Sequence, residues 1–179
     1  MTSSQIFLKI KFVSGPPLIG EAEYSGFQGQ IELLDFDWSL EVTGDAGFQR
    51  GGERKRKPSF GTFKMTKKFD SSSIPLYNRM KSREKIEWAV VTVAHSLGND
   101  LESGLRRAME YKISDARLTN VTVGMSGFGK GLIVQENLEF TYAKIEVVRF
   151  KISEDGRYGR SRETALTYTS RATGKVGLA

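Results

Sequence analysis

One stretch of the chain alternates strictly between apolar and polar residues, and it constrains the fold more than any other part of the sequence. The apolar members occupy every second position: Leu34, Phe36, Trp38, Leu40 and Val42. The members between them are polar and mostly acidic: Asp35, Asp37, Ser39 and Glu41. Successive side chains of a strand point to opposite faces, so this pattern predicts a half-buried strand with an apolar and an acidic face. Leu33 falls on the acidic side, and this change of phase predicts a bulge or bend.

Large aromatic side chains on this strand and on three other predicted strands should form the core. Aromatic residues bury a large apolar area each, so the strand at 30–42, which carries two of them, should nucleate the core. The predicted core positions are Phe36, Trp38, Phe63, Trp88 and Phe140. The acidic face of the strand must then look at water, at a partner or into a channel.

The rest of the chain divides into further strands and one helix. Strands are predicted at 5–13, 60–69, 86–95, 105–123 and 132–150. The last of these changes apolar parity near Ala143, which predicts a bulge. A helix is predicted within residues 70–84, where Ser72 or Ser73 can cap it and Pro75 suits its first turn. Six to eight strands, mostly joined by hairpins, favour an antiparallel β-barrel or closed sandwich with one flanking helix.

The length of 179 residues suits one domain, which we place at residues 1–150. Residues 151–179 are poor in hydrophobic residues and rich in arginine, serine, threonine and glycine, so we expect a flexible basic tail. The N-terminus lacks the basic region and apolar run of a cleaved signal peptide. No apolar stretch is long enough to cross a membrane. We therefore expect synthesis in the cytoplasm, no membrane insertion and, for any export, a route without a cleaved signal peptide.

The composition and motifs argue against an active site. The chain has no cysteine and a single histidine, His95, which excludes thiol chemistry and multi-histidine metal sites. Residues 124–131 match the first seven positions of a phosphate-binding P-loop. Gly131 stands where serine or threonine must hold magnesium, and a predicted strand follows instead of a helix. No nucleophile motif accompanies His95. We expect a protein that is not an enzyme and that has no cofactor and no metal site.

The net charge of +6 comes from two segments. Residues 44–59 carry five basic and two acidic residues, and residues 151–179 carry six and three, so the remainder is neutral. The stretch 43–59 lacks periodicity and is too long for a hairpin turn that only connects two strands, so it is predicted to be an extended functional loop. Its basic residues are Arg50, Arg54, Lys55, Arg56 and Lys57. They could be solvated, contact an acidic protein surface or bind nucleic acid, although no aromatic residues for base stacking are interleaved with them.

Several segments, in order, resemble the haemolysin co-regulated protein (Hcp) family, the tube protein of type VI secretion systems. Residues 6–10 resemble its first strand, and residues 30–42 its second, where an aromatic-x-Trp pair stands. Residues 63–76 resemble its passage from strand to helix, which reads Lys-x-x-Asp-x-Ser-Pro-x-Leu. The matching residues here are Lys67, Asp70, Ser73, Pro75 and Leu76, with Ile74 inserted before the proline. Residues 124–129 resemble a glycine-rich hairpin, and residues 136–147 the closing strand.

The resemblance covers about residues 5–150 and departs from the family in the loop 43–59 and the tail. It implies hexameric rings that stack into a tube inside a contractile sheath, with a spike protein and effector cargo as further partners. It also implies secretion from the bacterial cytoplasm without a cleaved signal peptide. We expect the polar residues Asp35, Asp37, Ser39 and Glu41 to face the lumen of a ring and the basic loop to join one ring to the next. Nucleic acid is not an expected partner; the alternative is a polyanion-binding barrel that uses the basic loop and tail.

Overall fold

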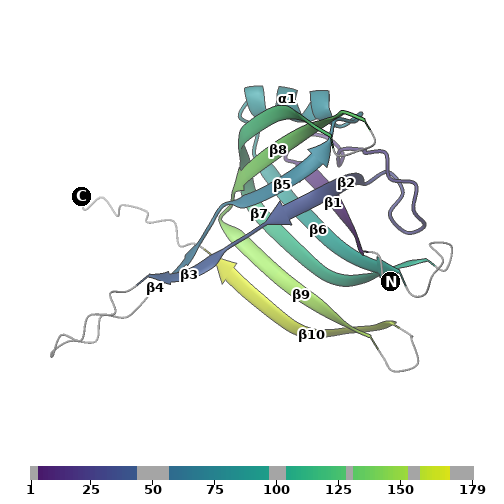
Figure 1. Ribbon diagram of the computed structural model, residues 1–179. Helices are drawn as coiled ribbons and strands as arrows, with labels where there is room; N and C mark the ends of the chain where they lie inside the picture. The colour runs from purple at the N-terminus through teal and green to yellow at the C-terminus, as the bar shows by residue number, and fades with distance from the viewer. Residues whose placement is uncertain (1–3, 44–56, 97–103, 128–130, 153–157, 170–179) are drawn as a thin grey trace, which may run out of the picture.

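The computed structural model describes residues 4–43, 57–96, 104–127, 131–152 and 158–169. Within these residues the chain forms ten strands and one helix (Figure 1). The strands are β1 (Ser4–Phe12), β2 (Ile31–Asp37), β3 (Leu40–Thr43), β4 (Lys57–Phe60), β5 (Phe63–Lys68), β6 (Ile86–Ser96), β7 (Leu105–Ser126), β8 (Ile133–Thr141), β9 (Lys144–Ile152) and β10 (Tyr158–Thr169). The helix, α1 (Ser73–Lys81), lies within the predicted helical segment.

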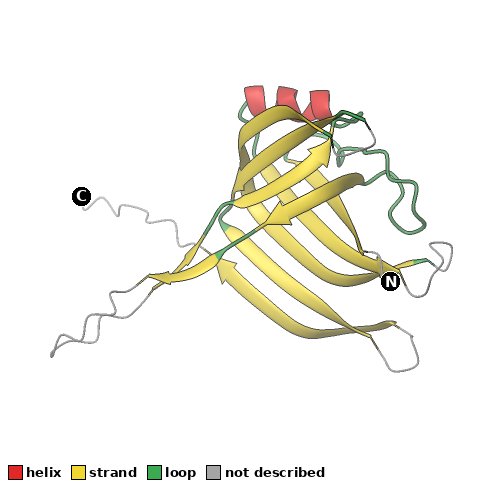
Figure 2. Cartoon of the chain, in the orientation of Figure 1, coloured by secondary structure: helices red, strands yellow, loops and turns green. Residues whose placement is uncertain are grey.

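Six of the described strands close into an antiparallel barrel. Their order is β7-β6-β1-β2-β5-β8, and β8 pairs with β7 to complete the circle. α1 lies across one end of the barrel (Figure 2), where the side chain of Leu76 is fully buried in the core. The predicted fold class, an antiparallel β-barrel with one flanking helix, is confirmed.

β7 is long enough to take part in two pairings along the same edge. Its residues 117–126 pair with β8, and its residues 109–114 pair with β9. Between these parts Asp115 has a φ of +52°, a conformation that aspartate tolerates better than most residues. The partner strand is interrupted at the same level, between Thr141 and Lys144. The parity change predicted near Ala143 is therefore a break between two strands at the point where β7 bends.

The bend opens the end of the barrel that is remote from α1. On the α1 side of the bend β8 pairs with β5, whereas beyond it β9 pairs with β10 instead. β2 pairs with β1 only through Ile31–Leu33, and its later residues pair with β5 alone. In Figure 1, β2 and β9 consequently diverge, and β9 and β10 extend away from the barrel.

The core fills the barrel between α1 and this open end. Phe63 and Phe140 are fully buried in it, whereas Phe36 and Trp38 are half-buried and pack against its edge. Trp88, predicted from its apolar surroundings to be a core residue, is instead half-buried outside this cluster. The register of β1 and β6 shifts beside Trp88, so that Ala89 takes the inward position and Trp88 turns to the other face.

A second, smaller cluster covers part of the outside of the barrel. Phe7 points outward from β1 and stacks on Phe27 of the loop 14–30, with 4.3 Å between ring centroids. Gly20 holds this loop close to β2, because its N–H donates to the Gly29 carbonyl at 2.8 Å. A Cβ at Gly20 would lie 2.4 Å from the Gln30 carbonyl oxygen, so only glycine fits there.

Part of the segment predicted to be a flexible tail is a strand. β10 pairs with β9 from Tyr158 to Thr169, with register irregularities near Arg162. Beyond the bend β9 would otherwise leave its second edge unpaired, and an unpaired edge readily accepts another strand. Residues 164–169 contain three threonines and a tyrosine, and both residue types favour strands.

Candidate functional site

The acidic face of β2 and β3 is exposed to solvent in the single chain. Asp35, Asp37, Ser39 and Glu41 all have exposed side chains. Asp35 lies opposite Thr66 and Asp37 opposite Lys64 on β5. Because residues directly opposite each other share a face, these groups form one polar surface on the outside of the barrel. A single chain contains no ring, so the orientation of this surface towards a lumen stays a prediction.

A register shift in β2 separates this acidic face from the buried start of the strand. Ile31 and Leu33 are buried and Leu34 is exposed, and the pairing with β5 shifts between Leu33 and Asp35. The bulge predicted from the change of phase at Leu33 is therefore confirmed. Beyond it, Phe36 and Trp38 turn inward, so the two halves of the strand bury opposite parities.

Aromatic side chains line the open end of the barrel. Phe36 lies 5.0 Å from Tyr111 of β7 and 5.7 Å from Phe63, measured between ring centroids. Trp38 contacts Phe60 and Tyr111, and its Nε1–H donates to the Tyr142 hydroxyl at 2.7 Å. Burial raises the pKa of Tyr111. These contacts hold the end of β2 against β7 and β8 where the main-chain pairing with β1 has ended.

A buried ionic network fixes α1 on the other end of the barrel. The Lys67 ammonium and the Glu136 carboxylate are fully buried, with Nζ 2.5 Å from Oε2. The same Nζ lies 2.8 Å from Asp70 Oδ1 and donates to Ser73 Oγ at 2.9 Å. Ser73 Oγ also donates to Glu136 Oε2 at 2.6 Å. Two strands and the first turn of the helix therefore share one set of charges and hydrogen bonds.

Tyr77 completes this network from the second turn of α1. Its hydroxyl donates to Glu136 Oε1, and burial together with this carboxylate raises its pKa. The cap predicted at Ser72 or Ser73 differs in detail. Ser72 is the first residue before the helix and makes no side-chain cap; its N–H and hydroxyl both donate to Asp70 Oδ1. Asp70 therefore orders the turn into the helix.

The sequence pointed to one half of this network only. The motif that resembles the Hcp family contains Lys67, Asp70 and Ser73, which are close in sequence. Glu136 lies 69 residues from Lys67 and directly opposite it on β8. A glutamate at an inward position of a strand was the available signal, but without the register nothing indicated its partner.

The predicted basic loop is carried by a separate two-stranded hairpin. β3 and β4 pair from Leu40–Phe60 to Thr43–Lys57 and project away from the barrel (Figure 1). Lys57 lies at the start of β4, whereas Arg50, Arg54, Lys55 and Arg56 lie outside the described residues. Both ends of the loop therefore leave the barrel along this hairpin.

The described residues bring no catalytic arrangement together. The single histidine, His95, has its Nδ1 2.9 Å from the exposed Ser4 hydroxyl and lies at the strand end remote from α1. Among the residues with a described position, no three acidic or histidine side chains could jointly hold a metal ion. No helix in the same part of the chain is long and apolar enough to span a membrane.

Comparison with known proteins shows the family. A family model described as "Type VI secretion system effector, Hcp" matches residues 7–148. The chain belongs to the Hcp family. The resemblance drawn from the ordered sequence motifs is thereby confirmed. The match includes the segment of the basic loop and ends before β10.

Solved Hcp structures share the fold at low sequence identity. Hcp1 from Escherichia coli is 17% identical, with a TM-score of 0.69 over 92% of this chain and 98% of that one. The secreted protein Hcp3 from Pseudomonas aeruginosa is 16% identical, with a TM-score of 0.63 over 95% and 100%. A chain of the baseplate of the anti-feeding prophage is 15% identical, with a TM-score of 0.50 over 81% and 93%. No curated protein sequence matches this chain.

Proposed function

We propose that this Hcp chain is a structural subunit of the type VI secretion inner tube. In this proposal six copies form a ring, rings stack into a tube, and a contractile sheath expels the tube together with its spike protein. Effector cargo travels in the lumen. The observation that carries the proposal is the Hcp family match across the closed barrel. The likeness to a chain of a phage-tail-like baseplate supports the same class of assembly.

The projecting hairpin supports a role for the basic loop in stacking. β3 and β4, which flank residues 44–56 in the sequence, project away from the barrel (Figure 1), and a cluster of like charges repels itself unless a partner of the other sign lies beside it. We propose that Arg50, Arg54, Lys55, Arg56 and Lys57 contact an acidic rim on the next ring. In the described residues, Glu21 and Glu23 of the loop 14–30 are exposed and suit that role.

The acidic face supports a role in the lumen. Asp35, Asp37, Ser39 and Glu41 are exposed, and no other described element covers them. We propose that this face lines the channel and meets the cargo. A channel surface must stay solvated and must not associate tightly with the cargo, and an acidic face meets both conditions.

Negative-stain electron microscopy of the purified chain tests the proposal. Six-fold rings, with or without stacks, are the expected result. Single chains whose mobility shifts when nucleic acid is added would contradict it and would favour the polyanion-binding alternative.

A further inference from the structure

The hairpin that joins β7 to β8 carries exposed apolar side chains. We call five of its residues the tip patch: Val123, Met125, Leu132, Ile133 and Val134. Met125 is 66% exposed and Leu132 is 71% exposed. Lys130 is the only charged residue in the sequence from 121 to 134, although charged residues make up 27% of the chain. Contiguous exposed apolar surface of this kind marks a place where a protein meets a partner.

The tip patch occupies both faces of the hairpin. Met125 lies opposite Val134, and Val123 lies opposite Glu136, whose carboxylate is held beneath α1. This face therefore turns towards the helix, where Phe69 and Ile74 add further exposed apolar side chains. Ile133 lies opposite Ser126, so it belongs to the other face. A hairpin that only covered its own barrel would need apolar residues on one face alone.

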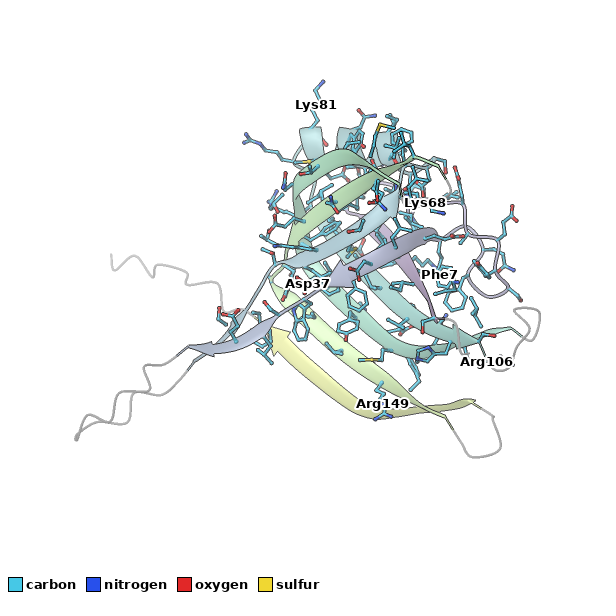
Figure 3. The ribbon with its side chains drawn as sticks, viewed as in Figure 1. Phe7, Asp37, Lys68, Lys81, Arg106 and Arg149 are labelled. Atoms are coloured by element: carbon cyan, nitrogen blue, oxygen red, sulfur yellow. The ribbon has the colours of Figure 1, made fainter. Side chains whose placement is uncertain are left out.

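The open end of the barrel offers a complementary apolar surface. Its half-buried side chains are Ile6, Phe36, Trp38, Tyr111 and Val147. Met125 lies 14 positions after Tyr111 on β7, which corresponds to roughly 45 Å measured along the strand. The tip patch stands beside α1 and the open end lies beyond the bend, so one chain cannot bring the two surfaces together. Figure 3 shows the open end between Asp37 on one side and Arg149 on the other.

We propose that the tip patch of one copy docks on the open end of a second copy of this chain. Uncharged apolar surface is typical of contacts between identical subunits, whereas short-lived contacts are more polar. Methionine packs well against aromatic rings, and Met125 would meet Phe36, Trp38 or Tyr111. A contact between two different surfaces at opposite ends of a subunit runs head to tail, and it closes into a ring when the rotation allows.

This inference rests on the proposed function, because it assigns a surface to the contact between tube subunits. A double variant, Met125→Asp with Leu132→Asp, places charge on the two most exposed residues of the tip patch. Both side chains are largely exposed in the single chain, so the circular dichroism spectrum should not change. The matched control is Val13→Asp, since Val13 is 60% exposed and follows β1, outside both the tip patch and the loop 14–30.

Sedimentation velocity of the three proteins tests the contact. We expect the wild type and Val13→Asp to assemble alike, and the double variant to lose rings or stacks at the same concentration. Assembly of the double variant that equals that of the control would overturn the inference and leave the proposed function standing. A wild type that remains a single chain would overturn both.

A cross-link tests which surface the tip patch meets. The chain has no cysteine, so Met125→Cys and Val147→Cys introduce the only thiols. Val147 of β9 lies opposite Tyr111, so the length of β7 between Tyr111 and Met125 keeps the two thiols of one chain apart, since bridged Cα atoms must lie within about 7 Å. Mild oxidation of the double-cysteine variant should give a ladder of dimers and higher multimers in denaturing electrophoresis. Pairing Val13→Cys with Val147→Cys should give none. An assembled double-cysteine protein without a ladder would contradict the docking.

Discussion

Removal of the Lys67 ammonium should strongly destabilise the fold. Lys67→Met keeps a long apolar side chain in the same buried position but takes away the charge. The carboxylates of Glu136 and Asp70 then remain near each other without a cation, and Ser73 loses a hydrogen-bond donor. Breaking a buried ion pair by removing one partner costs about 3–5 kcal/mol. For a chain of this length each kcal/mol lowers the melting temperature by about 2–4 °C, so we expect a fall of roughly 6–20 °C.

The matched control is Lys64→Met on the same strand. Lys64 is exposed on the outer face of β5, three positions before Lys67. Exposed charges contribute about 0–1 kcal/mol, so this change should leave the free energy of unfolding almost unchanged. Urea unfolding followed by circular dichroism measures both variants. All proteins should be compared at one concentration, because assembly would add to their apparent stability.

A companion variant separates charge from packing. Lys67→Met combined with Glu136→Leu removes both fully buried charges, and apolar replacement of a buried pair is often neutral. This double variant should regain part of the stability lost in Lys67→Met, although the Tyr77 hydroxyl then lacks its hydrogen-bond acceptor. In Lys67→Met alone, amide hydrogen exchange should accelerate first in α1, which the network anchors. If Lys67→Met lowered the free energy of unfolding by less than about 1 kcal/mol, as Lys64→Met should, the buried ionic network would be refuted.

Three further changes follow from the same structure. Trp38→Phe should lower the free energy of unfolding by about 1 kcal/mol, because it removes the hydrogen bond to Tyr142 but keeps the ring contacts. Trp38→Ala should lower it by less than the roughly 3–5 kcal/mol of a fully buried aromatic residue, since Trp38 is only half-buried. Urea unfolding measures both variants. The pKa of Tyr77 is raised above its ordinary value of 10.0, so the folded chain should lose stability as the pH rises past 10, and Tyr77→Phe should flatten this loss in thermal melts. Replacing Arg54, Lys55, Arg56 and Lys57 by serine should leave single rings intact and shorten their stacks in electron micrographs. For the wild type, 1 M salt should do the same, since the Debye length falls from about 10 Å at 0.1 M to about 3 Å at 1 M. Stacks of normal length formed by the serine variant at low salt would refute the contact.

Local pattern predicted those parts of the fold that depend on neighbours in sequence. The alternation from Leu34 to Val42 predicted a strand, and its change of phase at Leu33 predicted the bulge that the register with β5 contains. The proline and serines near residue 73 likewise predicted α1. These signals arise from side-chain direction and backbone propensity, which a single strand or helix already contains.

Features that depend on pairing between distant segments could not be predicted. Trp88 turned outward because β6 shifts register against β1, and an apolar run carries no sign of that shift. β10 forms because β9 has an unpaired edge beyond the bend at Asp115, which only the whole sheet creates. Phe36 and Trp38 are half-buried for the same reason, since the barrel opens beside them.

The mass of the assembled protein tests the central claim most directly. Native mass spectrometry of the purified wild-type chain should give a species of six copies of 20.0 kDa, about 120 kDa, and multiples of it where rings stack. A spectrum that contains only the 20.0 kDa chain over the whole concentration range would contradict a tube subunit that forms six-membered rings.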